Sequence, residues 1–300
     1  MGMMDGRAVL VTGAGRGVGR GIALELAKAG AAVVVNDLGV SITGENAEGS
    51  PAEQVAAEIK ALGGKAVANH DSVADWDGAC AMVKSAVDNF GRIDAVVNNA
   101  GNLRDVYFHK MSPEDFDAVI AVHLKGSFNT SRAAAPFFKE QGSGAYVHMT
   151  STSGLVGNFG QANYGAAKLG LAGFTKTLHL EGAKYNVRVN SLAPVAGTRM
   201  TEDIFPEGLF EQFTPENVVP AALYLVSEDA PTNMIIGAGG GGYHAAYVTM
   251  TPGVALRPED RNVEGFAAAW DKIIDRTGET VPQSGGEQSV AVMKALQALG

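Results

Sequence analysis

The chain has 300 residues, 46% of them hydrophobic and 18% charged, so it can bury the core of one large α/β domain or two small ones. Its net charge of −9 disfavours nucleic acid and anionic membrane surfaces as partners. The single cysteine, Cys80, excludes an intramolecular disulfide, and a reducing cytoplasm is the simplest compartment. No apolar run reaches the ~18 residues of a membrane span, so we predict no membrane insertion and no signal peptide.

Short apolar runs alternate with longer amphipathic segments along most of the chain. The runs predicted as strands are residues 8–11, 32–37, 65–68, 95–98, 145–149 and 187–192. Residues 20–29 and 52–62 are predicted helices, and further helices fill the other gaps. Apolar strands separated by helices require a parallel sheet that is covered on both faces, so we predict an α/β fold.

Two segments interrupt this alternation. Residues 38–50, rich in Gly, Ser and Asn, are long for a loop between a strand and a helix, which indicates a functional or a mobile loop. The second interruption starts with the glycine cluster Gly237–Gly242 and includes a helix near residues 262–276. About 55 residues could scarcely hold a separate core, so we divide the chain into a main domain, 5–242, and an extension, 243–300, packed on the core or at a subunit interface.

A glycine-rich turn, Thr12–Gly19, follows the first predicted strand and precedes the first predicted helix. Its spacing is G-x-x-x-G-x-G, which differs from the G-x-G-x-x-G dinucleotide fingerprint, and the glycines could simply mark a tight turn. The strand before it and the helix after it favour a dinucleotide site, because the backbone can approach a pyrophosphate at a helix amino terminus. The expected phosphate contacts are Gly13, Arg16, Gly17, Val18 and Gly19.

Asp37 ends the second predicted strand, near the ~20-residue offset of an acidic residue that binds the adenosine ribose. A carboxylate there accepts hydrogen bonds from the ribose hydroxyls and repels the 2′-phosphate of NADP, and the next residue is the uncharged Leu38. Arg16 is the contrary signal, because it could pair with a 2′-phosphate. We weigh Asp37 more heavily and predict NAD as the cofactor.

Residues 98–101, Asn-Asn-Ala-Gly, sit at the end of the fourth predicted strand, where an open α/β sheet places its cofactor cleft. An alternative is a capping turn in which the asparagines bond local backbone. Both can hold, since Asn99 could tie strands together while Gly101 leaves room for the adenosine half.

Tyr164 and Lys168 are four residues apart, so on a helix they share one face, and Ser151 directly follows the fifth predicted strand. A phenol with a pKa of ~10 is a poor base near neutrality, and a neighbouring ammonium lowers that pKa. Such a pair often occurs by chance. Its position after Ser151 and behind a nucleotide loop favours an enzyme that moves a hydride to or from a carbinol or carbonyl carbon, and we predict no metal site.

These motifs together resemble the short-chain dehydrogenase/reductase family over about residues 5–240. The resemblance implies a single Rossmann-type, doubly wound parallel sheet of about seven strands and a homodimer or homotetramer. It makes Tyr164 the general acid/base, with Lys168 binding the nicotinamide ribose and tuning Tyr164, and with Ser151 orienting the substrate oxygen. The further cofactor contacts that it implies are Asp71, Ser72 and Val73 at the adenine, Asn99, Ala100, Gly101 and Val122, and Pro194, Gly197, Thr198 and Met200 at the nicotinamide.

One position departs from the family pattern. Many members carry an asparagine that completes a catalytic tetrad, and here residues 122–128 read Val-His-Leu-Lys-Gly-Ser-Phe, so His123 replaces it. An imidazole can hold a water or a backbone group in a proton relay. A hydrogen-bonded structural histidine is the alternative, and the sequence leaves the two open.

Residues 122–128, 157–164 and 103–105 also resemble the dehydrogenase unit of peroxisomal multifunctional enzymes of type 2, as do the loop before Ser50 and parts of residues 250–283. That resemblance implies oxidation of a (3R)-3-hydroxyacyl-CoA by NAD, the acyl group being fatty or a steroid side chain. The CoA tail is anionic, and Arg104, Lys110, Arg199 and Arg257 are candidates for a basic patch, although each could be a solvated surface charge.

Two other functions remain open. The first keeps the chemistry and changes the substrate to a free hydroxysteroid or another secondary alcohol. The second, from another class, is an NAD-binding sensor or scaffold without turnover, against which the intact Ser151, Tyr164 and Lys168 argue.

Overall fold

The structure is a computed structural model that describes residues 2–41, 43, 50–197 and 210–299. The chain divides into two compact units, Met1–Ala245 and Ala246–Gly300. Within the described part of the chain, no helix is long and apolar enough to cross a bilayer.

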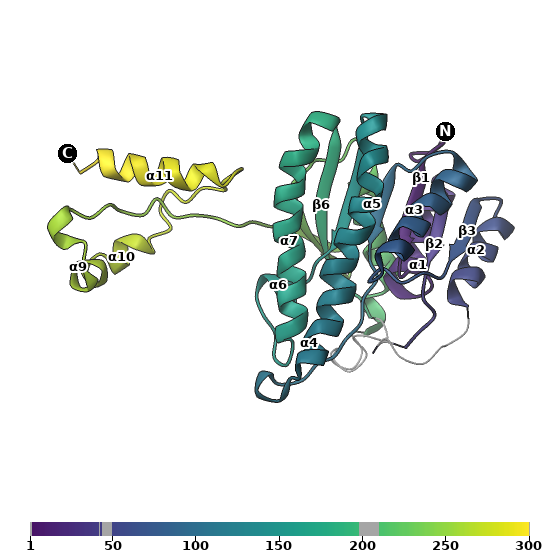
Figure 1. The fold of residues 1–300 in the computed structure, drawn as a ribbon, viewed down its shortest axis with the longest axis horizontal. Helices are drawn as coiled ribbons and strands as arrows, with labels where there is room; N and C mark the ends of the chain where they lie inside the picture. Colours follow the sequence, from purple (N-terminus) through teal and green to yellow (C-terminus); the bar gives the residue numbers. More distant parts are fainter. Residues whose placement is uncertain (1, 42, 44–49, 198–209, 300) are drawn as a thin grey trace. The chain divides into compact units, whose positions relative to one another are not determined.

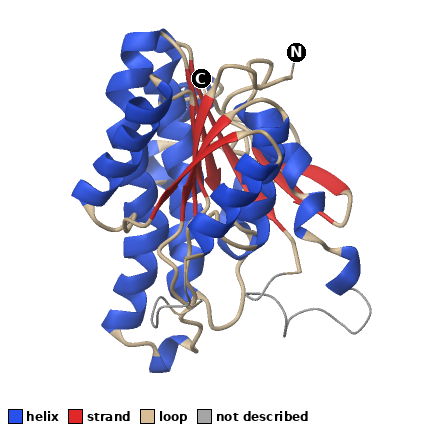
Figure 2. Cartoon of the chain, turned by 90° about the vertical axis from the view of Figure 1, so that its right-hand side faces the viewer, coloured by secondary structure: helices blue, strands red, loops and turns tan. Residues whose placement is uncertain are grey.

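The first unit contains one sheet with helices on both of its faces (Figures 1 and 2). The strands are β1 (Ala8–Thr12), β2 (Ala32–Asn36), β3 (Lys65–Asn69), β4 (Ala95–Asn98), β5 (Gly144–Met149), β6 (Val187–Pro194), β7 (Ile235–Gly239) and β8 (Gly242–Ala246). The helices are α1 (Gly17–Lys28), α2 (Pro51–Ala61), α3 (Trp76–Phe90), α4 (Pro113–Ile120), α5 (Gly126–Gln141), α6 (Thr152–Leu155), α7 (Ala162–Gly182) and α8 (Val219–Val226). The order β3-β2-β1-β4-β5-β6-β7-β8 confirms the doubly wound fold, with eight strands where about seven were expected.

The central strands are rich in β-branched residues because both faces of the sheet are buried. Leu10 on β1 lies opposite Val34 of β2 and Val96 of β4, and all three are fully buried in the core beneath α3 and α5. Their neighbours along the strands, such as Val9 and Val11, point to the opposite face and pack with α1, α2 and α8. The alternation of successive side chains therefore lets one short apolar run supply both cores.

β7 and β8 are not among the predicted strands, because the glycine cluster at residues 237–242 favours a break in the pattern. β7 pairs in parallel with β6, so its backbone hydrogen bonds are satisfied by a neighbour that is distant in sequence. A Cβ on Gly237 would lie 2.2 Å from Cε1 of His244, so this strand needs a glycine for close packing.

The second unit is small and largely exposed. Its helices are α9 (Val263–Ala268), α10 (Trp270–Ile273) and α11 (Gly286–Gln297), so the helix predicted near residues 262–276 is two short helices. Met250 and Thr280 exchange backbone hydrogen bonds of 2.9 Å, which close the segment that carries α9 and α10. The packing of residues 243–300 on the core or at a subunit interface stays a prediction, tested by deleting them and measuring assembly and kinetics.

Candidate functional site

The strand order reverses between β1 and β4, and Thr12 and Asn99 join the two strands there. The Thr12 hydroxyl accepts hydrogen bonds of 3.0 Å from the N–H groups of Asn99 and Ala100. The Asn99 amide donates to the carbonyl oxygens of Thr12 and Gly13 at 2.9 and 3.0 Å. Ligands of open α/β sheets bind outside the carboxyl ends of the strands at such a reversal, so Asn99 lies at the edge where a ligand of this fold is expected.

The glycine-rich turn after β1 is packed too closely for side chains. Gly13 has a φ of 62°, and a Cβ there would lie 2.8 Å from the Cα of Ala100. A Cβ on Gly19 would lie 2.3 Å from the Gly13 carbonyl oxygen. The helix α1 begins at Gly17, so its first N–H groups and the positive end of its dipole face this turn, as a pyrophosphate requires.

Asp37 lies directly after β2 and braces the same turn. One carboxylate oxygen accepts from the Gly15 N–H at 2.9 Å, and the other accepts from the Gly39 N–H at 2.8 Å. A carboxylate has about four lone-pair positions, so capacity for ribose hydroxyls is left. Arg16 reaches toward the same segment, with its Nη1 3.5 Å from the Val40 carbonyl oxygen. Leu38 is exposed beside Asp37.

The segment after β3 lies beside this region. The Asn36 amide donates to the Asp71 carbonyl oxygen at 2.9 Å, and the Asp37 N–H donates to the Asn69 carbonyl oxygen at 3.0 Å. The Asn129 amide holds the Val73 carbonyl oxygen at 2.9 Å from the side of α5. The predicted adenine-flanking residues 71–73 therefore lie at the same edge of the sheet as Asp37.

The predicted trio is brought together. Ser151 follows β5 and is the residue before α6, while Tyr164 and Lys168 lie on one face of α7. The Ser151 hydroxyl hydrogen-bonds the Tyr164 side chain, and the Lys168 Nζ lies 5.3 Å from the centre of the Tyr164 ring. The helices α6 and α7 can approach this closely because a Cβ on Gly154 would lie 2.6 Å from the Leu169 nitrogen.

Burial dominates the electrostatics of this trio. It lowers the pKa of Lys168 to about 7, and the ammonium donates a hydrogen bond of 2.6 Å to the Met149 carbonyl oxygen. It raises the pKa of Tyr164 to about 12, against the hydrogen bond from Ser151, and the charge of Asp105 raises it further. In the chain by itself, loss of hydration therefore keeps the pKa of Tyr164 above its usual value, and the lowering expected from Lys168 stays a prediction.

His123 lies against Tyr164. It belongs to a π-helical turn, Ala121–Lys125, and its ring is perpendicular to that of Tyr164, with the centroids 5.1 Å apart. Its Nε2 lies 2.8 Å from the carbonyl oxygen and 3.1 Å from the nitrogen of Asn102. A Cβ on Gly101 would lie 2.4 Å from its Cε1, so Gly101 makes room for this ring. The backbone bonds favour a structural histidine that positions Tyr164 and the turn after β4.

Two buried histidines make stability dependent on pH. Burial, with the charge of Lys168, lowers the pKa of His123 well below 6.5, and burial lowers that of His148 on β5 to about 3. Both stay neutral in the fold but gain protons at about pH 6.5 when unfolded. The free energy of unfolding should therefore fall below that pH, with each histidine adding a slope of about 1.4 kcal/mol per pH unit.

Urea unfolding of wild type and His148→Leu between pH 5.5 and 7.5 measures this slope. We expect the variant to lose about half of the histidine contribution. His109→Leu, which removes an exposed histidine, is the control and should keep the wild-type slope. Equal slopes for wild type and His148→Leu would contradict the assignment.

Three polar residues beside Tyr164 were missed by the sequence reasoning. The Gln161 amide donates to the Asp105 carboxylate at 2.6 Å, and the Asn163 amide donates to the Arg104 carbonyl oxygen at 2.9 Å. Burial raises the pKa of Asp105. These bonds hold the loop after β4 along the start of α7. Their partners lie more than 50 residues apart in the sequence, so the only available signal was that Asn163 precedes Tyr164.

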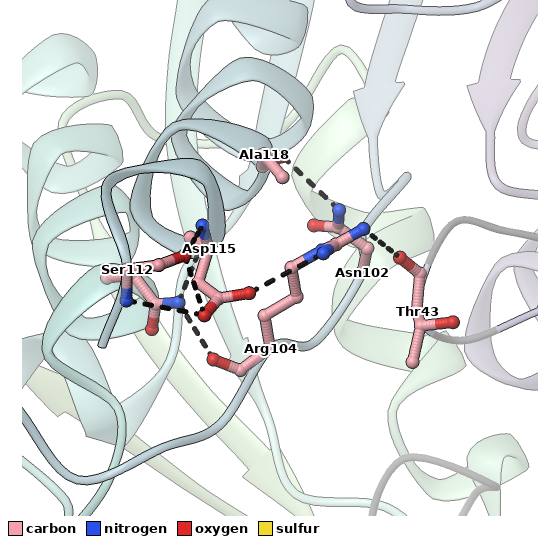
Figure 3. A network of polar contacts seen from close by, with 7 residues as sticks. Thr43, Asn102, Arg104, Ser112, Asp115 and Ala118 are labelled. Atoms are coloured by element: carbon pink, nitrogen blue, oxygen red, sulfur yellow. Dashed lines mark hydrogen bonds and ion pairs between the residues drawn. The ribbon is translucent and has the colours of Figure 1, made fainter. Parts of the chain in front are cut away.

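Arg104 is held in a polar network, which Figure 3 shows. Its Nη1 lies 3.5 Å from the Asp115 carboxylate, and its Nη2 lies 3.5 Å from the Thr43 carbonyl oxygen. Asp115 and Ser112 form a capping box at the start of α4, and the hydrogen bonds from Ser112, followed by Arg104, lower the pKa of Asp115. Arg104, which was predicted to belong to a basic patch, thus also forms an ion pair with Asp115. Lys110, another predicted member of that patch, is exposed.

The remaining predicted cofactor contacts are Val122 and residues at the end of β6 or just after it. Pro194 ends β6, and the Gly197 N–H donates to the Phe213 carbonyl oxygen at 2.5 Å. Val122 is partly buried beside His123. Thr198, Arg199 and Met200 lie outside the described residues, and Arg257 belongs to the second unit.

Comparisons with known proteins agree with this geometry. The chain is 51% identical to a short-chain type dehydrogenase/reductase of Mycobacterium tuberculosis, over 92% of this chain and 96% of that one. It is 46% identical to the peroxisomal multifunctional enzyme type 2 of mouse over 97% of this chain but only 40% of that protein. The chain thus spans less than half the length of that multifunctional relative.

Solved structures are similar as well. The full-length peroxisomal multifunctional enzyme type 2 of Drosophila melanogaster superposes with a TM-score of 0.83 at 35% identity, over 98% of this chain and 50% of that one. A 7α-hydroxysteroid dehydrogenase complexed with NADH and 7-oxo glycochenodeoxycholic acid has a TM-score of 0.72 at 28% identity, over 80% of this chain and 95% of that one. Residues 7–208 match the short chain dehydrogenase family. The chain is therefore an oxidoreductase of the short-chain dehydrogenase/reductase family, whose members use NAD or NADP.

Proposed function

We propose that this enzyme oxidises the 3-hydroxyl of a (3R)-3-hydroxyacyl-CoA to the 3-ketoacyl-CoA with NAD. The observation that carries the proposal is the meeting of Ser151, Tyr164 and Lys168 at the carboxyl edge of the sheet, beside the glycine-rich turn. The similarity to multifunctional enzymes over nearly the whole chain supports the substrate class.

The side chains divide the chemistry among them. A bound nicotinamide supplies the carbon that receives the hydride. The Tyr164 phenolate oxygen takes the proton of the substrate hydroxyl as the hydride leaves the carbon that bears it, and Ser151 orients the substrate oxygen by a hydrogen bond. Lys168, charged below its pKa of about 7, favours the phenolate of Tyr164.

Exposed apolar side chains beside the trio suit an acyl chain. Tyr107 and Phe108 are 60% and 78% exposed on the loop after β4, and Val156 and Phe159 are 86% and 90% exposed before α7. The two loops are tied together, because the Val106 N–H donates to the Gly160 carbonyl oxygen at 2.9 Å. Contiguous exposed apolar residues next to a reactive group mark a surface for an apolar ligand. Lys110, at the end of the same loop, offers a charge for the CoA tail.

A substrate screen tests the proposal. We expect turnover with NAD on (3R)-3-hydroxyacyl-CoA thioesters, and none on the (3S) thioesters or on free secondary alcohols, including hydroxysteroids. Activity on a free hydroxysteroid alone would replace the proposed substrate with the alternative one. Cofactor binding without turnover on any of these compounds would favour the sensor alternative.

NAD is the proposed cofactor because the Asp37 carboxylate after β2 would repel the 2′-phosphate of NADP. Replacing Asp37 with serine removes that negative charge while Arg16 remains, so the ratio of kcat/KM with NAD to that with NADP should fall by at least about tenfold. Steady-state kinetics with both cofactors measure the ratio. Asp77→Asn, which removes an exposed carboxylate on α3, should leave the ratio unchanged. An unchanged ratio in Asp37→Ser would remove the basis for choosing NAD.

A homodimer or homotetramer in the cytoplasm completes the proposal. Light scattering of the purified chain tests the assembly, and a monomer at working concentration would contradict it.

A further inference from the structure

A cavity lies at the amino edge of the sheet, away from Ser151, Tyr164 and Lys168. Its volume is about 290 Å³. Its polar lining residues are Arg7, Asp94, Ser143, Asn186, Arg188 and Glu228. Arg7, Asp94 and Asn186 directly precede β1, β4 and β6, whereas Ser151 follows β5. The strands therefore separate this cavity from the proposed cofactor and substrate sites.

The carboxylates at this cavity are already matched by cations. Asp94 is buried and accepts from Arg92 at 2.7 and 2.8 Å, from the Ala8 N–H at 2.8 Å and from Arg7 at 3.3 Å. Arg7 also pairs with Glu228. Neither carboxylate is left without a basic partner.

Arg188 is the remaining cation. Its Nε is buried and meets no acceptor among the described residues. Burial lowers the pKa of Arg188, the neighbouring Arg7 lowers it further, and Asp229 acts in the opposite direction. A buried guanidinium donor without an acceptor is costly, and buried polar groups in proteins are nearly always paired.

We infer that this cavity is a binding site for one small oxyanion, a phosphate or a carboxylate, held by Arg188 with Arg7 beside it. The planar fork of a guanidinium matches both groups with two parallel hydrogen bonds. The Ser143 hydroxyl and the Asn186 amide in the wall can donate further bonds.

The size and charge of the cavity limit the ligand. Pockets for larger ligands span about 300–1,000 Å³, so this cavity lies at the lower limit and suits a small anion instead of a nucleotide. One guanidinium with an unpaired Nε favours a single anionic group, because Asp94 and Glu228 would repel a polyanion.

Thermal unfolding of the full chain in inorganic phosphate tests the site, with sodium chloride at equal ionic strength as the reference and saturating NAD present throughout. We expect a saturable rise of the wild-type Tm with phosphate, which Arg188→Gln abolishes. Arg188→Lys keeps the charge but loses the fork, so it should need about tenfold more phosphate for half of the rise. Lys84→Gln, which removes an exposed charge on α3 outside the cavity lining, should keep the phosphate response.

An equal phosphate response in wild type and Arg188→Gln would overturn the inference, and so would a wild-type response no larger than that to chloride. If Arg188→Gln does not fold, the inference is tested by Arg188→Lys instead, through the phosphate concentration that this variant needs for half of the Tm rise. Acetate in the same assay separates the two ligands, since a response to phosphate alone assigns a phosphate site and a response to acetate assigns a carboxylate site. The inference is independent of the proposed substrate, because no arm measures turnover.

Discussion

Replacing Tyr164 with phenylalanine should lower kcat by about 10²- to 10⁴-fold, the usual contribution of a general acid/base, while NAD binding stays close to wild type. The substitution removes one oxygen and keeps the ring that packs edge-on against His123 at 5.1 Å, so the fold should hold. Stopped-flow or steady-state kinetics give kcat, and the quenching of protein fluorescence by added NAD gives the binding.

Tyr185→Phe is a matched control for this variant. Tyr185 also lies beside lysines, with the Lys184 and Lys139 nitrogens 4.9 and 5.6 Å from its ring centre, but it follows α7 at the other end from Tyr164. We expect wild-type kinetics from it. A Tyr164→Phe variant with near-normal rates would disprove the proposed acid/base.

Lys168→Met should have the second largest effect, and its size should depend on pH. The pKa of Lys168 is about 7, so its charge favours the Tyr164 phenolate mainly below that pH. Each unit by which loss of this charge raises the pKa of Tyr164 costs about tenfold in phenolate. We therefore expect kcat to fall by about tenfold to a hundredfold at pH 6, with a smaller deficit at pH 9.

The pH–rate profile of alcohol oxidation measures this deficit. Lys184→Met removes a lysine that lies beside a tyrosine outside the site and should leave the profile unchanged. A Lys168→Met deficit that is the same at pH 6 and pH 9 would show that the ammonium acts by holding the Met149 carbonyl, and that its charge is not decisive.

The charge of Asp105 also acts on the pKa of Tyr164, and the sequence did not reveal this contribution. It raises the pKa of Tyr164, whereas the hydrogen bond from Ser151 lowers it. Burial and these two groups, which come from different segments of the chain, therefore set the pKa of Tyr164. A resemblance that names only the trio describes the chemistry but not its pH dependence.

Local patterns predicted most of the fold, because strands, turns and helices of this kind depend on neighbours in sequence. The six predicted strands correspond to β1–β6 within two residues at their ends, and the glycine-rich turn precedes α1 as expected. The strand β7 escaped prediction because its glycines have little strand propensity and are stabilised by pairing with β6.

The sequence by itself determined the reaction type, since Ser151 after a strand and Tyr164 four residues before Lys168 on a helix are local arrangements. Tertiary structure alone decided how those groups are tuned. The contact of His123 with Tyr164, the bond from Gln161 to Asp105 and the unmatched Arg188 at the opposite edge join residues far apart in the chain. Burial and long-range charge pairs exist only after the sheet has assembled, so no spacing along the chain could reveal them.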